Sequence, residues 1–341
     1  MARPAIVLVG PARFTAAPPF AGGLESFVAT LATGLRRRGH RVVVVAGARS
    51  SSSGAGRRRD VADDAEDARR DGVALRDAVA DVVRSLDVGV IHNSSFSPEV
   101  LELIGSVPRL ETTLHTPPEP DMVAALRARP AAVLSTPSRV NATAWSDALE
   151  RRVDVVVNGV DRTVFRPTAR RPHGLAWVGR IVPEKGLHLA LDTAALLETP
   201  LRFAGPIHDR RYFDEWIRPR MSSSATYAGH LEPARLAALL GSATATLVTP
   251  LWAEPFGLTV IESLACGTPV AAVANGALCR GADASFCAST VVSADDVTPA
   301  GLAAAVLTAS SVPRSRCRAS SAPFDLDHVV AEWEARYGLA G

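Results

Sequence analysis

Short runs of aliphatic residues alternate with segments of helical periodicity along most of this 341-residue chain. Ala5–Val9 reads AIVLV and Arg41–Ala46 reads RVVVVA, and the intervening Glu25–Arg38 repeats its apolar residues at helical spacing. Strands without polar alternation are buried on both faces, as they are in parallel sheets covered by helices. The alternation therefore predicts an α/β fold built from βαβ units.

The expected strands and helices fall into two sets, and the join lies near Asn158–Pro172. Each set resembles a doubly wound sheet, so we expect two Rossmann-like domains, over residues 1–165 and 166–322. Residues 323–341 contain a last helix that we expect to cross back to the first domain. The other expected elements are strands at Val88–His92, Leu110–Leu114, Ala132–Ser135, Val153–Val157, the LAWVGR run after Gly174, Leu201–Ala204, Ala225–Ala228, Thr246–Thr249 and Val270–Val273, and helices at Leu187–Leu197, Pro233–Leu240 and Leu326–Tyr337.

Residues Ser50–Asp71 interrupt the series. They are serine-rich at first and then densely charged. This composition is typical of a solvated connection, so we expect a mobile surface excursion.

Composition narrows the functional classes. A formal net charge of +2 is too small to favour a nucleic-acid partner, and no nucleic-acid-binding motif occurs. No apolar run approaches the roughly 20 residues that span a bilayer, and the first apolar run has strand length. The four cysteines form no C-x-x-C pair and are interpreted as reduced, mostly packed thiols. We therefore expect a cytoplasmic protein. Arg36–Arg38 could contact a membrane surface. Cations are also favoured at a helix C-terminus, and the ordinary last turn of a helix is the favoured interpretation.

The 37 basic residues include a single lysine, Lys185. Richness in Ala, Arg, Gly and Pro indicates a coding bias that replaces Lys by Arg wherever either serves. An ammonium and a planar guanidinium are not interchangeable, so Lys185 is predicted to have a specific chemical role. Chance is the alternative, since one lysine must lie somewhere.

Several common cofactor motifs are missing. No G-x-G-x-x-G follows the first strand of either set, which removes the main support for a nicotinamide cofactor. No Walker loop, H-E-x-x-H or G-x-S-x-G occurs either. Ligands of open α/β sheets bind beyond the carboxyl ends of the strands, so binding residues are expected in the loops there.

Two of these loops suit an anion. Gly22 and Gly23 precede the first helix, where glycine permits close backbone approach and a helix N-terminus favours negative charge. An ordinary Gly-Gly turn explains them equally well. The loop Gly179–Gly186, GRIVPEKG, carries Arg180 and Lys185. The planar guanidinium of Arg180 and the compact ammonium of Lys185 can bind a phosphate together. A solvated basic loop is the alternative.

The segment Glu254–Val270, EPFGLTVIESLACGTPV, holds two glutamates. A helix beginning at Gly257 or Leu258 leaves its first N–H groups without helical partners, so an anion can bind there. Glu254 would precede this helix, and Glu262 would lie about one turn into it. Carboxylates repel a diphosphate but accept hydrogen bonds from vicinal hydroxyls. These properties point to a nucleotide sugar; the alternative is two exposed glutamates near a helix start.

His115 follows another expected strand, within ETTLHTPPEP. It could hydrogen-bond a reacting sugar or an acceptor, although a loop histidine satisfied by its neighbours is by itself the favoured interpretation. His92, after the preceding strand, is interpreted as structural.

Together, GRIVPEKG, GHLEPARLAALL and EPFGLTVIESLACGTPV resemble the retaining glycosyltransferases of family 4, also called group 1. AGGLE, LHTPPEP and NGVDRTVFRP extend the resemblance over nearly the whole chain, and the E-x7-E spacing with P-F-G is its specific part. The resemblance implies the GT-B fold, in which two doubly wound Rossmann-like domains face each other across a cleft.

The resemblance also implies roles for individual residues. Arg180 and Lys185 would hold the donor diphosphate, Glu262 would bind the ribose hydroxyls and Glu254 the donor sugar hydroxyls. His115 would lie near the anomeric carbon. The other implied donor contacts are the loop of Gly22 and Gly23 near the diphosphate, Gly229 and His230 beside the nucleobase, the backbone N–H groups of Phe256, Gly257 and Leu258, and Thr259 facing phosphate.

One loop departs from the family pattern. Members often have a Gly-Gly and an acidic residue after the strand that follows the glutamate motif, whereas this chain reads ANGALCRG, with Cys279 and Arg280. The role of Asn275–Arg280 is therefore open, and so is the donor preference.

The implied activity is transfer of a hexose from a nucleoside-diphosphate sugar, with a UDP-sugar favoured, to a hydroxyl of a small acceptor of the specialised-metabolite kind. The resemblance implies retention of anomeric configuration, with attack from the leaving-group face while Arg180 and Lys185 stabilise the departing diphosphate. No cofactor and no metal is expected, because two cations take the metal's role. The alternatives are a nucleotide-sugar epimerase of similar fold and a non-catalytic subunit that binds sugar nucleotides.

Overall fold

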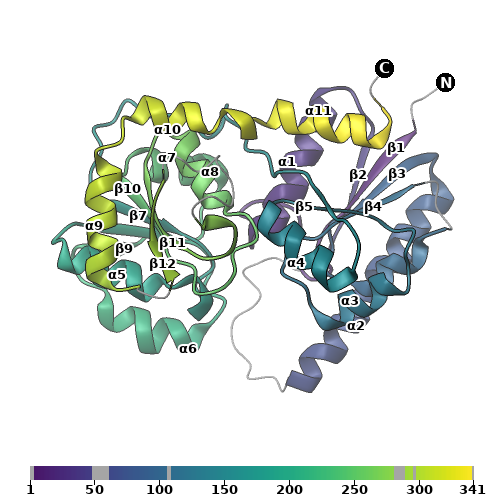
Figure 1. Cartoon of the computed structure of the whole chain (residues 1–341), viewed down its shortest axis with the longest axis horizontal. Coiled ribbons are helices and arrows are strands. Elements are labelled where there is room, and N and C mark those ends of the chain that lie inside the picture. Colours follow the sequence, from purple (N-terminus) through teal and green to yellow (C-terminus); the bar gives the residue numbers. More distant parts are fainter. Residues whose placement is uncertain (1–3, 48–60, 106–108, 280–288, 295–296, 340–341) are drawn as a thin grey trace. The chain divides into compact units, whose positions relative to one another are not determined.

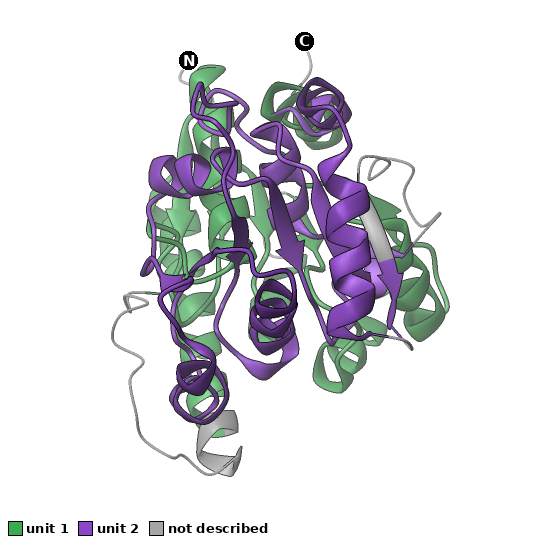
Figure 2. Ribbon diagram, turned by 90° about the vertical axis from the view of Figure 1, so that its left-hand side faces the viewer, with its two compact units in different colours: residues 1–159, 326–341 green, residues 160–325 purple. Residues whose placement is uncertain are grey.

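The computed structural model describes residues 4–47, 61–105, 109–279, 289–294 and 297–339 (Figure 1). The chain forms two compact units: unit 1 comprises Met1–Gly159 and Leu326–Gly341, and unit 2 comprises Val160–Asp325 (Figure 2). Each unit contains one six-stranded sheet, and all of the strand pairs are parallel. No helix in the described ranges has the length and apolar character needed to cross a bilayer.

The sheet of unit 1 has the strand order β2-β1-β3-β4-β5-β6. Ile6 of β1 lies opposite Val42 of β2 and Val90 of β3, so the order reverses at β1, as in a doubly wound fold. The elements of unit 1 are β1 (Ala5–Val9), α1 (Gly23–Arg37), β2 (Val42–Val45), α2 (Val61–Ser85), β3 (Val88–Asn93), η2 (Pro98–Leu103), β4 (Leu110–Thr113), α3 (Pro120–Arg127), β5 (Val133–Thr136), α4 (Arg139–Leu149), β6 (Asp154–Val155) and α11 (Leu326–Tyr337).

Helices cover both faces of this sheet. Adjacent residues of a strand point to opposite faces, and in β1 Leu8 packs with Leu31 of α1 and Trp333 of α11. Val7 packs on the other face with Val79 of α2. Both sides of β1 are therefore buried, which explains its unbroken apolar sequence.

Polar contacts fasten the C-terminal helix α11 to unit 1. Arg336 donates to the fully buried carboxylate of Glu111 at 2.6 Å and to Asp154 at 3.0 Å. His92 Nδ1 lies 2.5 Å from the Tyr337 hydroxyl, and burial holds the pKa of His92 well below its usual value. His92 is thus enclosed in the interior of unit 1.

The sheet of unit 2 has the strand order β12-β11-β10-β7-β8-β9. Its order reverses at β7, which pairs with β8 on one side and with β10 on the other. The elements of unit 2 are β7 (Leu175–Val178), η3 (Pro183–Lys185), α5 (Leu187–Leu196), β8 (Leu201–Ala204), α6 (Arg210–Tyr212), the π-helix η4 (Phe213–Ile217), η5 (Arg218–Arg220), β9 (Ala225–Tyr227), α7 (Pro233–Gly241), β10 (Ala245–Val248), α8 (Leu258–Ala265), β11 (Val270–Ala274), η6 (Gly276–Leu278), β12 (Ser289–Ser293), α9 (Pro299–Ser310), α10 (Arg314–Ser320) and η9 (Ala322–Phe324).

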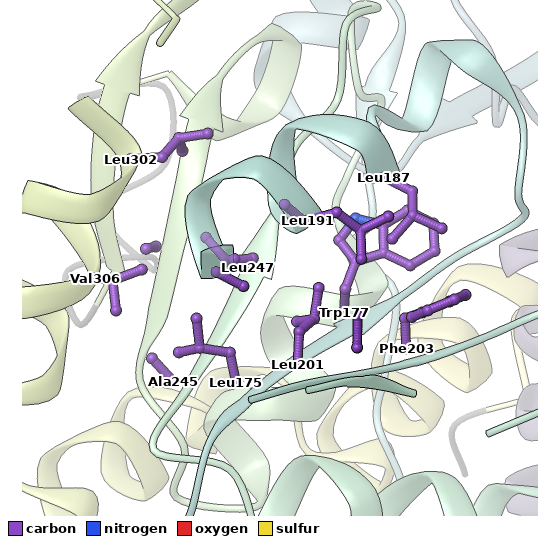
Figure 3. Close-up of a cluster of buried hydrophobic side chains, with 14 of the residues drawn as sticks. Leu175, Trp177, Leu187, Leu191, Leu201, Phe203, Ala245, Leu247, Leu302 and Val306 are labelled. Atoms are coloured by element: carbon purple, nitrogen blue, oxygen red, sulfur yellow. The ribbon is translucent and has the colours of Figure 1, made fainter. Parts of the chain in front are cut away.

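The core of unit 2 also lies on both sides of its sheet. Figure 3 shows Leu191 of α5 and Val306 of α9 in the cluster that includes Trp177 of β7. On the opposite face, Leu264 of α8 packs with Cys317 of α10. The carboxyl ends of β7 and β10 lead into the loops that contain Lys185 and Glu254.

The expected strands and helices are confirmed to within one or two residues at most ends, and β1, β8 and α11 have the predicted bounds. The prediction of a mobile excursion over Ser50–Asp71 is wrong from Val61 onward, where α2 begins; residues 50–60 lie outside the described ranges. Alanine and arginine are good helix formers, and Arg70 pairs with Asp67 one turn away. A dense run of charge is therefore compatible with a helix whose later turns are anchored in the core through Leu75 and Val79.

Candidate functional site

The topology of unit 2 brings the loops of the two main sequence motifs to one point of the sheet. The order reverses at β7, and the loops that leave β7 and β10 flank this reversal. Gly179–Gly186 follows β7, and the segment containing Glu254 follows β10. Open α/β sheets bind ligands at such a switch point, beyond the carboxyl ends of the strands.

The loop that carries Lys185 is fastened to the end of β10. Thr249 accepts a hydrogen bond from the Trp177 indole at 3.0 Å, and its hydroxyl lies 2.9 Å from the carbonyl oxygens of Lys185 and Gly186. Gly186 has a φ of +65°, and a Cβ there would come within 2.2 Å of the Thr249 carbonyl oxygen. Only glycine fits this approach, which fixes the backbone from which the Lys185 side chain extends.

Lys185 and Glu254 form an ion pair. Lys185 Nζ lies 2.6 Å from Glu254 Oε2, and the two side chains are only 20% and 15% exposed. Trp252 joins both groups: its indole N–H donates to the same Oε2 at 3.1 Å, and its ring centre lies 4.7 Å from Nζ. No sequence motif had pointed to Trp252.

The turn after β11 supports the backbone of Glu254. The N–H group of Ala277 donates to the Glu254 carbonyl oxygen at 2.7 Å. Gly276 has a φ of +61°, and a Cβ there would lie 2.4 Å from both the nitrogen and the oxygen of Glu254. The described part of the atypical Asn275–Arg280 loop therefore packs closely against the backbone of Glu254, while Arg280 lies outside the described residues.

Helix α8 begins at Leu258 with Gly257 as its N-cap residue, as predicted. Gly257 has a φ of +94°, which turns the chain into the helix. Phe256 is buried and packs against Phe324, with ring centres 5.8 Å apart. The Thr259 hydroxyl lies 3.5 Å from the last carbonyl oxygen of β7. The first N–H groups of α8 have no partners within the helix, and they lie beside the motif loops.

Glu262 lies within α8 and is only 7% exposed. Burial raises the pKa of its carboxyl group to about 8. Among the residues that the structure describes, no side chain donates a hydrogen bond to it. Neither glutamate of the motif is therefore an exposed surface residue, and a pKa of about 8 makes the protonated form of Glu262 the major one at neutral pH.

Arg180 lies at the same edge of the sheet but is more exposed. Its guanidinium is 3.8 Å from the Glu184 carboxylate. His208, in the loop after β8, is close enough for Arg180 and His230 to lower its pKa, although burial is the larger cause. His208 is a candidate that the sequence motifs missed; its place in the loop after a predicted strand was the available signal.

The loops after β7, β8 and β9 are tied together by glycines. The carbonyl oxygen of Gly229 accepts the N–H of Gly205 at 3.0 Å, and Gly229 has a φ of +84°. A Cβ on Gly205 would lie 1.8 Å from the Gly179 carbonyl oxygen. The loop of Gly229 and His230 is thereby held against the loop that contains Arg180.

The remaining predicted residues belong to unit 1. Gly22 is the N-cap residue of α1 and Gly23 is its first residue, so this helix N-terminus follows the loop after β1. His115 follows β4, and its ring centre lies 4.6 Å from that of Phe27. Burial lowers the pKa of His115 to about 3, and its buried Nε2 has no hydrogen-bond partner in the described structure. His115 is thus a neutral imidazole with an unsatisfied nitrogen.

Comparison with protein families matches both halves of the chain. Residues 21–164 match the model of Glycosyltransferase Family 4, and residues 168–314 match that of glycosyl transferases group 1. Solved structures of glycosyltransferases and of a sucrose-phosphate synthase align over nearly the whole chain, and each unit of this chain contains a doubly wound sheet. The chain therefore has the GT-B fold. It belongs to the family 4, or group 1, glycosyltransferases.

Individual relatives show the same kinship. Glycogen synthase from Mycobacterium tuberculosis H37Rv is 34% identical over 180 residues, which cover 50% of this chain and 42% of that protein. D-inositol 3-phosphate glycosyltransferase from Mycolicibacterium paratuberculosis is 34% identical over 215 residues, covering 55% and 48%. The chain thus matches less than half the length of these relatives.

Two solved structures illustrate the shared fold. AviGT4, a glycosyltransferase involved in avilamycin A biosynthesis, has a TM-score of 0.71 at 22% identity and covers 98% of this chain and 97% of its own. Anabaena HepE, crystallised with UDP-glucose, has a TM-score of 0.69 at 17% identity and covers 97% and 99%.

Proposed function

We propose that this protein is a retaining hexosyltransferase that takes a hexose from a nucleoside-diphosphate sugar, with UDP-glucose the first donor to test. The observation that carries the proposal is the meeting of Lys185 and Glu254 at the switch point of unit 2. Membership of family 4 supports a sugar nucleotide as the donor, and the HepE crystals contain UDP-glucose. The acceptor is proposed to be a small hydroxylated molecule.

In this proposal Lys185 and Arg180 bind the donor diphosphate. Lys185 leaves Glu254 and turns to the phosphate, and Arg180 supplies a second cation from the same loop. The N–H groups at the start of α8, around Phe256, Gly257, Leu258 and Thr259, add a helix N-terminus, which favours an anion. Positive charge placed before the reaction stabilises the charge that develops on the leaving diphosphate. For this reason we expect the reaction to need no metal.

The two glutamates of the motif take hydroxyl groups on either side of that diphosphate. Glu254, released by Lys185, accepts hydrogen bonds from the transferred sugar. Glu262 accepts them from the ribose, and its ionised carboxylate can do so with both oxygens. Gly229 and His230 flank the nucleobase in this proposal, and His208 lies near enough to Arg180 and His230 to contribute there.

The residues of unit 1 serve the sugar and the acceptor. The loop of Gly22 and Gly23 approaches the diphosphate. His115 is neutral, so its unsatisfied Nε2 can exchange a hydrogen bond with a hydroxyl without adding charge. The bond from the acceptor oxygen to C1 forms on the face from which the diphosphate leaves, and the hydroxyl proton passes to the departing phosphate oxygen. Retention of configuration follows.

A thermal-shift screen against UDP, GDP, ADP and TDP tests donor binding, because a ligand of the folded state raises Tm by mass action. The matching glucose conjugate is then incubated with D-inositol 3-phosphate and with glycogen, the acceptors or product named in two relatives, and with a set of small polyols. Mass spectrometry should show one added hexose, unchanged by EDTA. Conversion of the donor into an epimer without an acceptor would indicate an epimerase, and binding with neither transfer nor hydrolysis would indicate a non-catalytic subunit.

A further inference from the structure

Trp252 lies between the two charged residues of the donor site and contacts both. Its indole N–H donates to Glu254 Oε2 at 3.1 Å, and the same oxygen accepts from Lys185 Nζ at 2.6 Å. The ring centre is 4.7 Å from Nζ, within the range of a cation–π interaction. One side chain therefore restrains the positions of an anion and a cation that are brought together from loops 69 residues apart in the chain.

Packing alone does not account for this tryptophan. It is partly exposed, and it is not part of the two hydrophobic clusters that the described residues of unit 2 form around Trp177 and around Leu264. Its neighbours Leu251 and Ala253 are exposed, so the segment lies at the surface of the unit. Among the described residues, Trp252 makes a hydrogen bond to Glu254 and a cation–π contact with Lys185, and both contacts are polar in character.

The two contacts have different consequences when a diphosphate draws Lys185 away. Glu254 then loses the donor at 2.6 Å but keeps the indole N–H on Oε2, so the carboxylate remains oriented. No donor among the described residues contacts its other oxygen, Oε1. The ring, for its part, limits the space that the ammonium explores without competing for its hydrogen bonds.

We propose that Trp252 is a positioning residue that keeps the Glu254 carboxylate directed at the transferred sugar after Lys185 has moved to the diphosphate. The inference rests on the proposed function. In this inference the indole N–H orients the Glu254 carboxylate that binds the sugar, and the indole ring restrains the Lys185 ammonium. Two substitutions separate these parts: Trp252→Phe removes the N–H and keeps a ring, whereas Trp252→Leu removes both.

The experiment compares binding of UDP, GDP, ADP and TDP with binding of their glucose conjugates by calorimetry. The variants are Trp252→Phe, Trp252→Leu and the control Trp216→Phe, which alters a half-exposed tryptophan of the same unit that contacts His188 and Arg220. We expect Trp252→Phe to bind the glucose conjugate about tenfold more weakly and the nucleoside diphosphate as the unaltered protein does. Trp252→Leu should weaken both ligands, and Trp216→Phe neither.

The outcomes distinguish this inference from the function on which it rests. If the unaltered protein binds none of the four nucleotides, the proposed function fails and the inference fails with it. If it binds one and Trp252→Phe preserves the ratio of the two affinities, the inference alone is overturned. An equal loss for both ligands accompanied by a lower Tm would also overturn it, because that pattern is the signature of a purely structural residue.

Discussion

The protonation of Glu262 should make donor binding depend on pH. Its carboxyl pKa is about 8, so the ionised form is the minority at neutral pH. A carboxylate can accept a hydrogen bond from each hydroxyl of the ribose, whereas a protonated carboxyl must spend one oxygen as a donor. We therefore expect the donor to select the ionised form, and binding then requires the release of a proton.

The size of the effect follows from the pKa. If only the ionised form binds, the apparent dissociation constant rises by the ratio of total protein to protein with Glu262 ionised. For a pKa of about 8 this ratio is about 100 at pH 6, about ten at pH 7 and about two at pH 8. Between pH 6 and pH 8.5 the affinity should rise about 80-fold. Since both phosphates of a sugar nucleotide are esterified, the ligand itself keeps its charge over this range.

Calorimetry with UDP-glucose, or with the conjugate selected by the screen, measures this rise. At pH 7, titrations in two buffers of different ionisation enthalpy should show release of about 0.9 proton for each donor bound. Glu262→Gln cannot titrate and should bind more weakly at pH 8.5, with an affinity that hardly changes with pH. An affinity independent of pH, one that falls as pH rises, or an unchanged slope in Glu262→Gln would refute the reasoning.

Three further predictions concern the site and the fold. Lys185→Ala should lower turnover by about two to three orders of magnitude in a single-turnover transfer assay, and a near-normal rate would remove Lys185 from the mechanism. Gly276→Ala would place a Cβ 2.4 Å from backbone atoms of Glu254 at a φ of +61°. Urea unfolding should therefore show a free energy of unfolding lower by about 3 kcal/mol or more. Gly338→Ala, at a φ of +74° with open space around it, isolates the cost of φ alone and should lose less. Arg336→Ala leaves the Glu111 carboxylate, which is 0% exposed, without its partner, and we expect a loss of about 3–5 kcal/mol in the same assay. Arg336→Leu combined with Glu111→Leu should recover much of it, whereas equal losses in the single and double variants would contradict the assignment.

The sequence predicted the features that depend on local patterns. Unbroken aliphatic runs marked the buried parallel strands, and the Pro-Phe-Gly turn marked the start of α8 at Leu258. The order of the strands also placed Lys185 and Glu254 in loops at the carboxyl edge of one sheet. One local feature was predicted wrongly: at Val61–Asp71 the dense charge suggested a loop, and helix propensity prevailed.

Features that depend on contacts between distant segments could not be read in this way. Trp252 acquires its meaning only when folding brings Lys185 beside it. Glu262 was expected to be an ionised acceptor. The burial that raises the pKa of its carboxyl group arises from tertiary packing, which the local sequence does not reveal. His208 became a candidate only when the loop after β8 was found next to Arg180.

The central claim is that the loops at the switch point of unit 2 hold a sugar nucleotide by its diphosphate. A crystal structure of the protein with its bound sugar nucleotide tests this claim directly. We predict that Lys185 Nζ and the Arg180 guanidinium contact the diphosphate, with the ribose on Glu262 and Lys185 separated from Glu254. A diphosphate bound away from both cations, with the Lys185–Glu254 pair still intact, would contradict it.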